Sequence, residues 1–282
     1  MIHFCIVIYN KLVSDSETYI SLKQSLQQIE YSSKKIYVFD NSIDDFIRKN
    51  NKKYSFENNI VYFTHNKNVG ISKAYNFVIN KIKNNKDIEN DYFITFDDDT
   101  KIKSCYLQEL VKTIEEEDAD VYIPVVYANG IMISPSNCLL HAKVLIVDNI
   151  SKINLKYVTG INTGLCIKMK NFSKIYYNDE LFLDNVDHSL FESIHKNKLK
   201  IFILKNCVLY QNYSQFENIS RNKRIERFHI ALKDNKKYAQ GNWIKNIFFR
   251  ISGWRQAVIF NKKYLTNDFT EIYRSIWNKY EL

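Results

Sequence analysis

A short apolar run leads directly into three consecutive carboxylates in Tyr92-Phe93-Ile94-Thr95-Phe96-Asp97-Asp98-Asp99-Thr100. The apolar residues predict a buried strand that ends at Asp97. Neighbouring carboxylates repel one another unless a cation or hydrogen-bond donors share their charge, and oxygen ligands suit Mg²⁺ or Mn²⁺. Because alternate side chains of an extended segment point the same way, we expect Asp97 and Asp99 to share one metal, while Asp98 points toward a ribose hydroxyl. The alternative interpretation is a solvated acidic turn.

Residues 1–125 alternate between strand and helix patterns. Predicted strands cover 2–8, 35–39, 60–64, 92–97 and 121–125, and predicted helices cover 14–30, 72–83 and 107–117. This alternation predicts a mostly parallel sheet covered by helices, which binds ligands beyond the carboxyl ends of its strands. Polar residues follow four of these strands, at Tyr9-Asn10, Asp40-Asn41, Asn66 to Gly70 and Asp97 to Asp99. The coincidence favours a ligand-binding crevice over solvated turns.

The patterns weaken after residue 126. Residues 127–157 are expected to be rich in loops, and strand-like sequence resumes over 157–169. Gly160 and Gly164 in that segment are expected to let the backbone approach a ligand closely, although they do not form a dinucleotide fingerprint. A predicted helix over 189–196 and a strand over 200–210 follow. Asp184 and Asp187 precede this helix, as N-caps or as catalytic groups.

Composition bounds the class of protein. The chain has 282 residues, of which 45% are hydrophobic, so it can bury the core of one large domain with an appended tail. Its five cysteines are widely separated, which argues against a disulfide framework or a zinc knuckle and favours a reducing cytoplasm. The first residues lack the pattern of a signal peptide, and no run of 18 apolar residues occurs. We therefore expect neither secretion nor a membrane span.

Positive charge is concentrated in the last 64 residues. Residues 1–218 carry 26 Lys and Arg against 26 Asp and Glu, whereas residues 219–282 carry 14 against 5. Such a tail can bind nucleic acid, anionic lipid or substrate phosphates. Residues 243–265 mix aromatic side chains with cations as an interfacial helix does, and the alternative is that these aromatics pack against the domain or a second subunit. Candidate contacts for an acceptor diphosphate are Arg221, Lys223, Arg224 and Arg227.

The acidic crevice suits transfer of a group from a nucleoside diphosphate. A metal on Asp97 and Asp99 would bridge the pyrophosphate and stabilise charge on a leaving diphosphate. Breaking a glycosyl–phosphate bond also needs a base that deprotonates an acceptor hydroxyl on the opposite face of the sugar. Asp187 suits this role, and Asp184 is the neighbour that would tune or replace it.

Five motifs occur in an order that resembles a known family. They are Ile6-Val7-Ile8-Tyr9-Asn10, Asp40-Asn41-Ser42 followed by Asp44 or Asp45, Asn68-Val69-Gly70-Ile71-Ser72-Lys73-Ala74-Tyr75-Asn76, Phe96-Asp97-Asp98-Asp99 and Phe182-Leu183-Asp184-Asn185-Val186-Asp187. Over about residues 1–235 the chain resembles family 2 glycosyltransferases of the GT-A fold, and within that family it is most similar to a rhamnosyltransferase-like bacterial branch.

The resemblance implies a fold and a set of site residues. The fold is α/β, the GT-A nucleotide-diphospho-sugar transferase fold, with a mostly parallel central sheet flanked by helices. A catalytic domain over 1–218, divided into a nucleotide-sugar half (1–125) and an acceptor half (126–218), precedes a basic, aromatic-rich helical region over 219–282. Asp187 takes the position of the base, beside Asp184. The implied metal ligands are Asp97, Asp99 and Gln211, and the implied donor-binding residues are Tyr9, Asn10, Asp40, Asn68, Gly70, Lys73, Asn76 and Asp98.

Three departures from the family pattern limit what carries over. Gln211 stands where branch members tend to have a histidine, which weakens the expected metal site, and Ser193 stands where an arginine is frequent. The Gln-x-x-Arg-Trp segment of processive synthases does not occur in the sequence. We therefore expect an enzyme that adds a single sugar.

The resemblance implies inverting, non-processive transfer of one sugar from a nucleotide-diphosphate donor. The donor is a UDP- or dTDP-sugar, such as dTDP-rhamnose or a UDP-hexose, and the cofactor is Mn²⁺ or Mg²⁺. The acceptor is a hydroxyl of a bacterial surface polysaccharide, O-antigen or capsule, or of a lipid-linked oligosaccharide. We expect a cytoplasmic protein, peripheral at the inner face of the cell membrane through residues 243–265, with no nucleic-acid partner and with its oligomeric state left open.

Two rival functions are considered. A sugar nucleotidyltransferase of related fold would need a Gly-rich first turn bearing Lys or Arg, and Tyr9-Asn10-Lys11-Leu12 offers little of that. A non-enzymatic protein that binds nucleic acid or an anionic surface through the basic tail would leave the acidic crevice unexplained.

Overall fold

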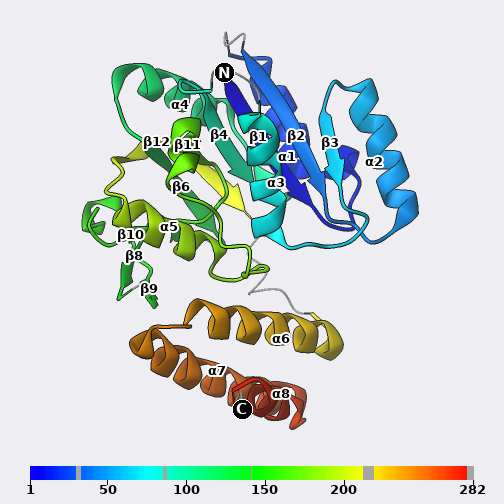
Figure 1. The fold of residues 1–282 in the computed structure, drawn as a ribbon, viewed down its shortest axis with the longest axis vertical. Helices are drawn as coiled ribbons and strands as arrows, with labels where there is room; N and C mark the ends of the chain where they lie inside the picture. Colours follow the sequence, from blue (N-terminus) through cyan, green and yellow to red (C-terminus); the bar gives the residue numbers. More distant parts are fainter. Residues whose placement is uncertain (30–32, 85–87, 141, 212–218, 278–282) are drawn as a thin grey trace.

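A computed structural model describes residues 1–29, 33–84, 88–140, 142–211 and 219–277 of the chain. Its central element is a twisted sheet with the strand order β3-β2-β1-β4-β11-β6-β12-β5, and β7 pairs with β6 outside this path (Figure 1). The strands are β1 (Ile2–Ile8), β2 (Lys34–Asp40), β3 (Val61–Thr64), β4 (Tyr92–Phe96), β5 (Thr100–Lys101), β6 (Val121–Ala128), β7 (Ile131–Ser134), β11 (Leu165–Lys168) and β12 (Ile201–Gln211).

The sheet is mostly parallel, as the alternating pattern predicts. Strands β1, β2, β3 and β4 run the same way, and β12 is parallel to β6. Between these two groups lies β11, which is antiparallel to both β4 and β6. The two groups, β1 to β4 and β6 with β12, therefore point in the same direction. Their carboxyl ends therefore share one edge of the sheet, where the polar residues that follow them meet.

Helices cover both faces of the sheet. Buried side chains of α3 (Ile71–Lys83) and α5 (Val186–Lys196) belong to one core cluster, and those of α1 (Glu17–Leu26) and α4 (Ser104–Glu116) belong to the other. Helix α2 (Asp45–Glu57) lies beyond β3 at the edge of the sheet (Figure 1). Helix α2 was not predicted, because its exposed, polar composition hides the helical period. Its N-cap is Asp44, whose side chain accepts from the backbone N–H groups of Phe46 and Ile47.

Residues 127–157 form more regular structure than expected. Besides β7, they contain β8 (Ser136–Leu139) and β9 (Lys143–Leu145), which with β10 (Val158–Thr159) form a small antiparallel sheet of order β10-β8-β9. The expectation of a loop-rich segment is therefore wrong. These strands are three or four residues long, too short to show an alternating pattern in the sequence.

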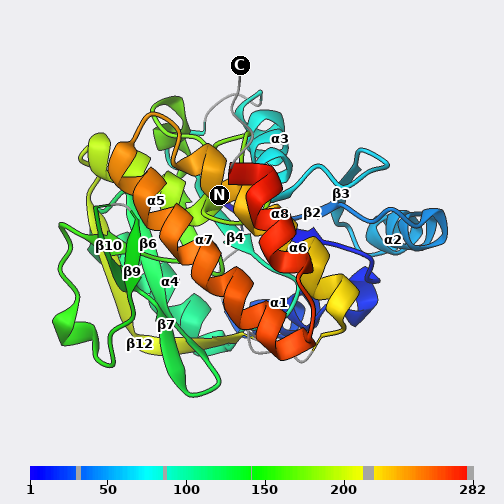
Figure 2. The same cartoon turned by 90° about the horizontal axis from the view of Figure 1, so that it is seen from below.

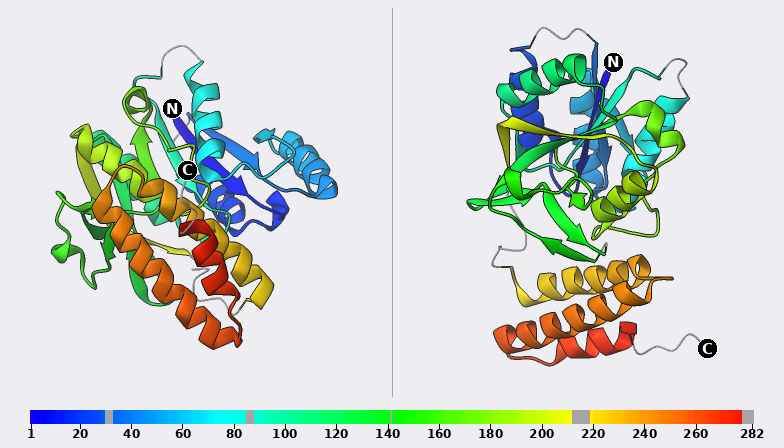
Figure 3. Two further views of the ribbon diagram at one scale, coloured as in Figure 1. Left: turned by 60° about the horizontal axis from the view of Figure 1, so that its bottom comes forward. Right: turned by 90° about the vertical axis from the view of Figure 1, so that its left-hand side faces the viewer.

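The C-terminal region forms a helical layer of its own. Helices α6 (Arg221–Tyr238), α7 (Trp243–Tyr264) and α8 (Asp268–Trp277) lie below the carboxyl ends of β1, β2 and β3 in Figure 1, and the right-hand view of Figure 3 shows α6 between the sheet and α7. Ion pairs join this layer to α5 and the loop before it, from Lys245 to Glu192 at 2.6 Å and from Lys237 to Glu180 at 3.2 Å. The expected domain boundary at residue 218 lies outside the described residues.

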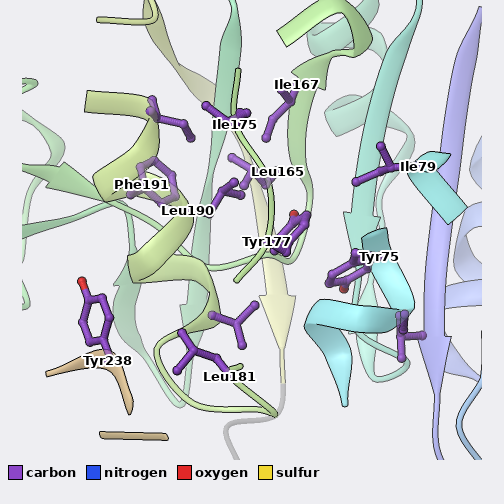
Figure 4. Close-up of a cluster of buried hydrophobic side chains, with 14 of the residues drawn as sticks. Tyr75, Ile79, Leu165, Ile167, Ile175, Tyr177, Leu181, Leu190, Phe191 and Tyr238 are labelled. Atoms are coloured by element: carbon purple, nitrogen blue, oxygen red, sulfur yellow. The ribbon is translucent and has the colours of Figure 1, made fainter. Parts of the chain in front are cut away.

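An aromatic core connects the sheet with the loop that precedes α5. The rings of Tyr75 on α3 and Tyr177 lie 5.0 Å apart, and both side chains are fully buried (Figure 4). Leu181, Leu190 and Tyr238 extend the same cluster toward α6. The core therefore runs continuously from the sheet into the C-terminal helices.

Three thiols are buried and free, those of Cys5, Cys138 and Cys166. Cys105 is disulfide-bonded, which the sequence analysis did not anticipate. Within the described part of the chain, no helix is both long enough and apolar enough to cross a membrane.

Helix α3 begins at a glycine that touches the segment before α5. Gly70 has φ of 83°, and a Cβ built on it would lie 2.6 Å from the backbone oxygen of Phe182. That oxygen also accepts a hydrogen bond of 2.8 Å from the backbone N–H of Ile71. Only glycine allows this approach, because any side chain would meet the Phe182 backbone.

We predict that Gly70→Ala destabilises the protein more than Gly130→Ala does. Gly130 has a similar φ of 78° with nothing within 4 Å of a built Cβ, so both variants carry the same backbone strain and only Gly70→Ala adds a clash. The difference in the free energy of unfolding is expected to be about 1–3 kcal/mol, measured by urea denaturation. Equal losses would contradict the close approach.

Candidate active site

The acidic turn after β4 converges on Gln211. The Nε2 of Gln211 donates to Asp97 Oδ2 at 2.8 Å and to Asp99 Oδ1 at 3.3 Å, so both carboxylates face the same amide, as the alternation predicts. Gln211 reaches them because it is the last residue of β12 and pairs with Thr100 of β5, one residue beyond Asp99. The register of the sheet therefore assembles a site from residues 97–99 and 211.

Desolvation and like-charge repulsion oppose ionisation of this site. Desolvation raises the pKa of Asp99 to about 7, repulsion from Asp97 and Asp98 adds to the rise, and Lys11 and Gln211 oppose it. Desolvation also raises the pKa of Asp97, hydrogen bonds from Gln211 and Thr163 oppose the rise, and repulsion from Asp98 and Asp187 adds to it. Two half-buried carboxylates with raised pKa values form a site suited to a counter-cation.

The oxygens present suit a hard divalent cation. The carboxylates of Asp97 and Asp99 both accept hydrogen bonds from the side-chain amide of Gln211. The Oε1 atom of that amide is buried and has no hydrogen-bond partner among the described residues. Within those residues no cluster of three or more His, Cys, Asp or Glu side chains forms a complete metal site. The two carboxylates therefore suit a hard divalent cation such as Mg²⁺ or Mn²⁺, which Asp97 and Asp99 would hold, and Gln211 would join them only with its Oε1 turned toward them.

Asp98 points away from this pair. Its Oδ1 accepts a hydrogen bond of 2.8 Å from Lys11 Nζ, so the structure gives it a cationic partner from the loop after β1. Its backbone oxygen accepts from Ser16 Oγ at 2.9 Å, and the Asp97 backbone oxygen accepts from Thr18 Oγ1 at 2.5 Å. Residues at the start of α1 therefore hold the acidic turn in place, a role that the sequence analysis missed.

Asp187 lies in the first turn of α5. Its Oδ1 accepts from the backbone N–H of His188 at 2.8 Å, and the side chain is 20% exposed, so the carboxylate remains accessible. The N-cap residue of α5 is Asn185, which contradicts the interpretation of Asp184 and Asp187 as N-caps. Repulsion from Asp187 makes a small contribution to the raised pKa of Asp97, after burial and repulsion from Asp98.

Asp184 forms an ion pair with an arginine, whereas a base that accepts a proton from the acceptor hydroxyl needs a free carboxylate oxygen. Arg227 of α6 binds Asp184 through both guanidinium nitrogens, with Nη2 donating to Oδ1 at 2.8 Å. A bidentate ion pair fixes the orientation of the Asp184 carboxylate and occupies both of its oxygens. The geometry therefore favours Asp187 over Asp184 as the proton acceptor.

A basic cleft lies beside the start of α3. It has a volume of about 690 Å³, within the usual range of small-molecule sites. Its lining residues are His65, Lys67, Asn68, Val69, Lys73 and Phe182. Asn68 and Lys73 were expected at a donor site, and both line this cleft. The structure adds His65 and Lys67, whose basic side chains suit a diphosphate.

Three expected donor-binding residues sit at the ends of β1 and β2. Tyr9 is 47% exposed and free to contact a ligand, whereas Asn10 Oδ1 accepts from the backbone N–H of Ile43 at 3.1 Å. Asp40 is fully buried, and its oxygens accept from the backbone N–H of Ser42, from Asn51 Nδ2 and from Tyr62 Oη at 2.8–2.9 Å. This geometry does not support direct contact of Asp40 with a base; its carboxylate shapes the turn.

Two further residues that were expected to lie near a ligand contact other parts of the protein. The Asn76 amide donates to the Tyr177 carbonyl and to Asp179, each at 2.7 Å, and Asn76 lines a separate hollow of about 240 Å³. A Cβ on Gly164 would lie 2.5 Å from Leu209 Cδ1, so this glycine accommodates a core side chain. Both residues position other segments of the chain.

The C-terminal layer holds the segment before α5, which the sequence analysis missed. Asp234 of α6 is 2% exposed and accepts from the backbone N–H groups of Phe182, Leu183 and Asp184 at 3.0, 2.8 and 2.7 Å. No sequence signal pointed to Asp234, because its partners are backbone groups about 50 residues away.

Most of the candidate tail cations have partners within the chain. Arg221 forms an ion pair with Asp268, Arg224 lies over the ring of Phe260 with 8% of its surface exposed, and Arg227 binds Asp184. Only Lys223 of the four is exposed with no such contact shown within the described residues. Contact of this cluster with an acceptor diphosphate is therefore not supported.

We predict that the metal-free protein loses stability as pH rises from about 4 to about 7. The folded state binds the Asp99 proton more tightly than the unfolded state does, so deprotonation in this window favours unfolding. Asp99→Asn is expected to flatten the pH dependence of the melting temperature in the presence of a chelator. The exposed Asp15→Asn is the control, and an unchanged slope in Asp99→Asn would contradict the prediction.

Solved structures share this fold at low sequence identity. S. aureus TarS 1-349 matches with a TM-score of 0.53 and 14% identity over 99% of this chain and 90% of that chain. GalNAc-T7 with UDP, GalNAc and Mn²⁺ matches with a TM-score of 0.60 and 14% identity over 98% of this chain and 56% of that chain. The chain spans 42% of the longer S. aureus TarS chain. These likenesses show the GT-A architecture.

A family comparison agrees with the fold. No curated protein matches the sequence. The model of the family described as glycosyl transferase family 2 matches residues 4–166, which span β1 to β11 and include the acidic turn. Since this match covers more than half of the chain, the protein belongs to glycosyl transferase family 2.

Proposed function

We propose that this glycosyltransferase moves one sugar from a nucleotide-diphosphate donor to an acceptor hydroxyl, with inversion and without processive addition. The observation that carries the proposal is the convergence of Asp97 and Asp99 on Gln211 at the carboxyl edge of the sheet. Asp187, which lies in the first turn of α5 and is 20% exposed, is the proposed base.

In this proposal each side chain has a separate task. A divalent cation bound by Asp97, Asp99 and Gln211 would neutralise charge on the leaving diphosphate. Lys67 and Lys73 bind phosphate oxygens from the basic cleft. Asp187 takes the proton of the acceptor hydroxyl while that oxygen attacks the anomeric carbon from the face opposite the diphosphate, which inverts its configuration.

The donor is proposed to be a UDP- or dTDP-sugar. S. aureus TarS 1-349 has been solved in complex with UDP-GlcNAc at a TM-score of 0.50, and GalNAc-T7 with UDP and Mn²⁺, and these ligands support a uridine donor and Mn²⁺ or Mg²⁺. UDP-hexoses and dTDP-rhamnose both remain candidates. The rhamnosyltransferase-like assignment rests on motif resemblance alone.

The acceptor is proposed to be a bacterial surface polysaccharide, O-antigen or capsule, or its lipid-linked precursor, at the inner face of the cell membrane. The division into a catalytic domain over 1–218 and a helical region over 219–282 belongs to this proposal. Contacts of Asp234 and Arg227 with the segment before α5 support a helical region that contributes to the catalytic site.

The two rival functions fit the structure less well. A nucleotidyltransferase would need phosphate-binding groups in the loop after β1, where Lys11 is instead paired with Asp98. A nucleic-acid binder would leave the acidic pair Asp97 and Asp99 without a role, and three of its tail cations, Arg221, Arg224 and Arg227, contact other parts of the chain.

The proposal predicts a metal-dependent rise in melting temperature with one nucleoside diphosphate from a panel of UDP, dTDP, GDP and CDP, because a ligand that binds only the folded state stabilises it. Asp99→Ala should abolish the rise. Asp187→Ala should keep it and lower the rate of sugar transfer about 10²- to 10⁴-fold, the usual contribution of a general base. No shift with any diphosphate, or full transfer by Asp187→Ala, would reject the proposal.

We also predict that Asp234→Asn and Arg227→Ala lower kcat by at least about tenfold while the melting-temperature shift with diphosphate persists, because both residues position the segment that carries Asp187. Arg221→Ala is the matched control, since Arg221 forms a similar ion pair from α6 but binds Asp268. Equal losses in kcat for Arg221→Ala and Arg227→Ala would indicate a merely structural role.

A further inference from the structure

Helix α7 carries a stripe of large apolar side chains on its solvent-facing side. Its buried residues are Lys245, Phe249, Gly253 and Ala257, one on each successive turn. The stripe occupies the opposite side, with exposed fractions of 73% for Trp243, 50% for Ile247, 57% for Ile251, 53% for Trp254 and 42% for Val258. Spacings of three or four residues place these five side chains in one line along the helix.

The structure separates the two interpretations of residues 243–265. Phe249 packs into the core against Tyr238, so part of the aromatic content is structural. Trp243 and Trp254 point the other way and pack against no core cluster of the described residues. The stripe is therefore an apolar surface that the folded chain leaves exposed on α7, the helix that crosses the front of the view in Figure 2.

The charge of α7 indicates what covers the stripe. The helix carries five cations and no carboxylate over its 22 residues. Arg250, Arg255, Lys262 and Lys263 are exposed, and Arg255 and Lys262 lie one helical step beside the stripe. Pairing of α7 with the α7 of a second copy would bring these like charges together, which disfavours association. An apolar stripe with a cationic border and two tryptophans suits an anionic lipid surface.

We propose that α7 docks on an anionic bilayer through Trp243, Ile247, Ile251, Trp254 and Val258, while Arg255 and Lys262 bind lipid headgroups. The helix then lies parallel to the membrane plane, its apolar side chains in the interface and its cations at headgroup level. Because α6 packs against α7 and positions the segment before α5, docking would fix the active site at a set height above the bilayer. This last step rests on the proposed function, whereas docking itself does not.

Tryptophan fluorescence tests docking in the unaltered full-length chain. The protein has three tryptophans, and Trp277 is only 3% exposed, so the exposed signal comes from Trp243 and Trp254. Vesicles of phosphatidylcholine with phosphatidylglycerol should shift the emission to the blue, and brominated lipid should quench it. Vesicles of phosphatidylcholine alone should act much more weakly, and added salt should weaken binding further. No shift with anionic vesicles would overturn the proposal.

Cosedimentation with the same vesicles tests which residues are responsible. Trp243→Ser with Trp254→Ser should lower the affinity for anionic vesicles at least about tenfold, and so should Arg255→Gln with Lys262→Gln. Helix α2 provides matched controls, because Phe56 is 86% exposed and Lys49 and Lys52 are also exposed. Phe56→Ser and Lys49→Gln with Lys52→Gln should bind as the wild type does.

Two outcomes separate the alternatives. If size-exclusion chromatography shows a dimer that the double tryptophan variant dissociates, and vesicles are not bound, a second copy covers the stripe and the proposal is wrong. If vesicle binding is absent while a nucleoside diphosphate still raises the melting temperature, docking fails and the proposed function stands. Equal losses of vesicle binding in the α2 and α7 variants would also overturn the proposal.

Discussion

Asp97 and Asp99 place two negative charges at the carboxyl end of β4, where burial raises the pKa of each carboxyl group. Such a pair is costly to bury without donors or a cation. The chain supplies some donors from distant segments, Gln211 from the end of β12 and Thr163 from the loop before β11. Much of the topology at this edge of the sheet therefore serves to complete one acidic site.

The position of β11 between β4 and β6 also brings a hydrogen-bond donor to the acidic turn. Because β11 is antiparallel to both neighbours, the loop that precedes it lies at the carboxyl end of β4. Thr163 in this loop donates to Asp97 Oδ2 at 3.0 Å. The mostly parallel sheet thus gains a side-chain donor beside the acidic turn.

The segment before α5 depends on contacts from two sides. Gly70 and Ile71 at the start of α3 meet the backbone oxygen of Phe182, and Asp234 of α6 accepts from three successive N–H groups that begin at Phe182. The start of α3, beside the basic cleft, and the C-terminal helices therefore both hold residues 182–184 in place. Both contacts help to position Asp187, the proposed base, through elements that are close to it in space and distant from it in the sequence.

The sequence predicted the repetitive part of the fold well, because that part depends on local patterns. β1 occupies residues 2–8, as expected, and α3 begins one residue before its expected start. Strands β8 and β9 and helix α2 were missed, since short strands and a polar edge helix have weak periodicity. Of the candidate site, the convergence of Asp97 and Asp99 followed from alternation, whereas the burial of Asp40 depends on Asn51 and Tyr62 from other elements.

The sequence by itself predicted an α/β sheet with an acidic turn at the carboxyl ends of its strands, followed by a basic helical region. These predictions succeed because strand alternation, helix period and charge are properties of neighbouring residues. Tertiary structure alone assigned partners to the charges. It paired Arg227 with Asp184, buried Asp234 under three backbone N–H groups and turned Trp243 and Trp254 outward. These assignments join residues that are 40 or more positions apart or lie on opposite sides of one helix, and only packing in three dimensions selects among them.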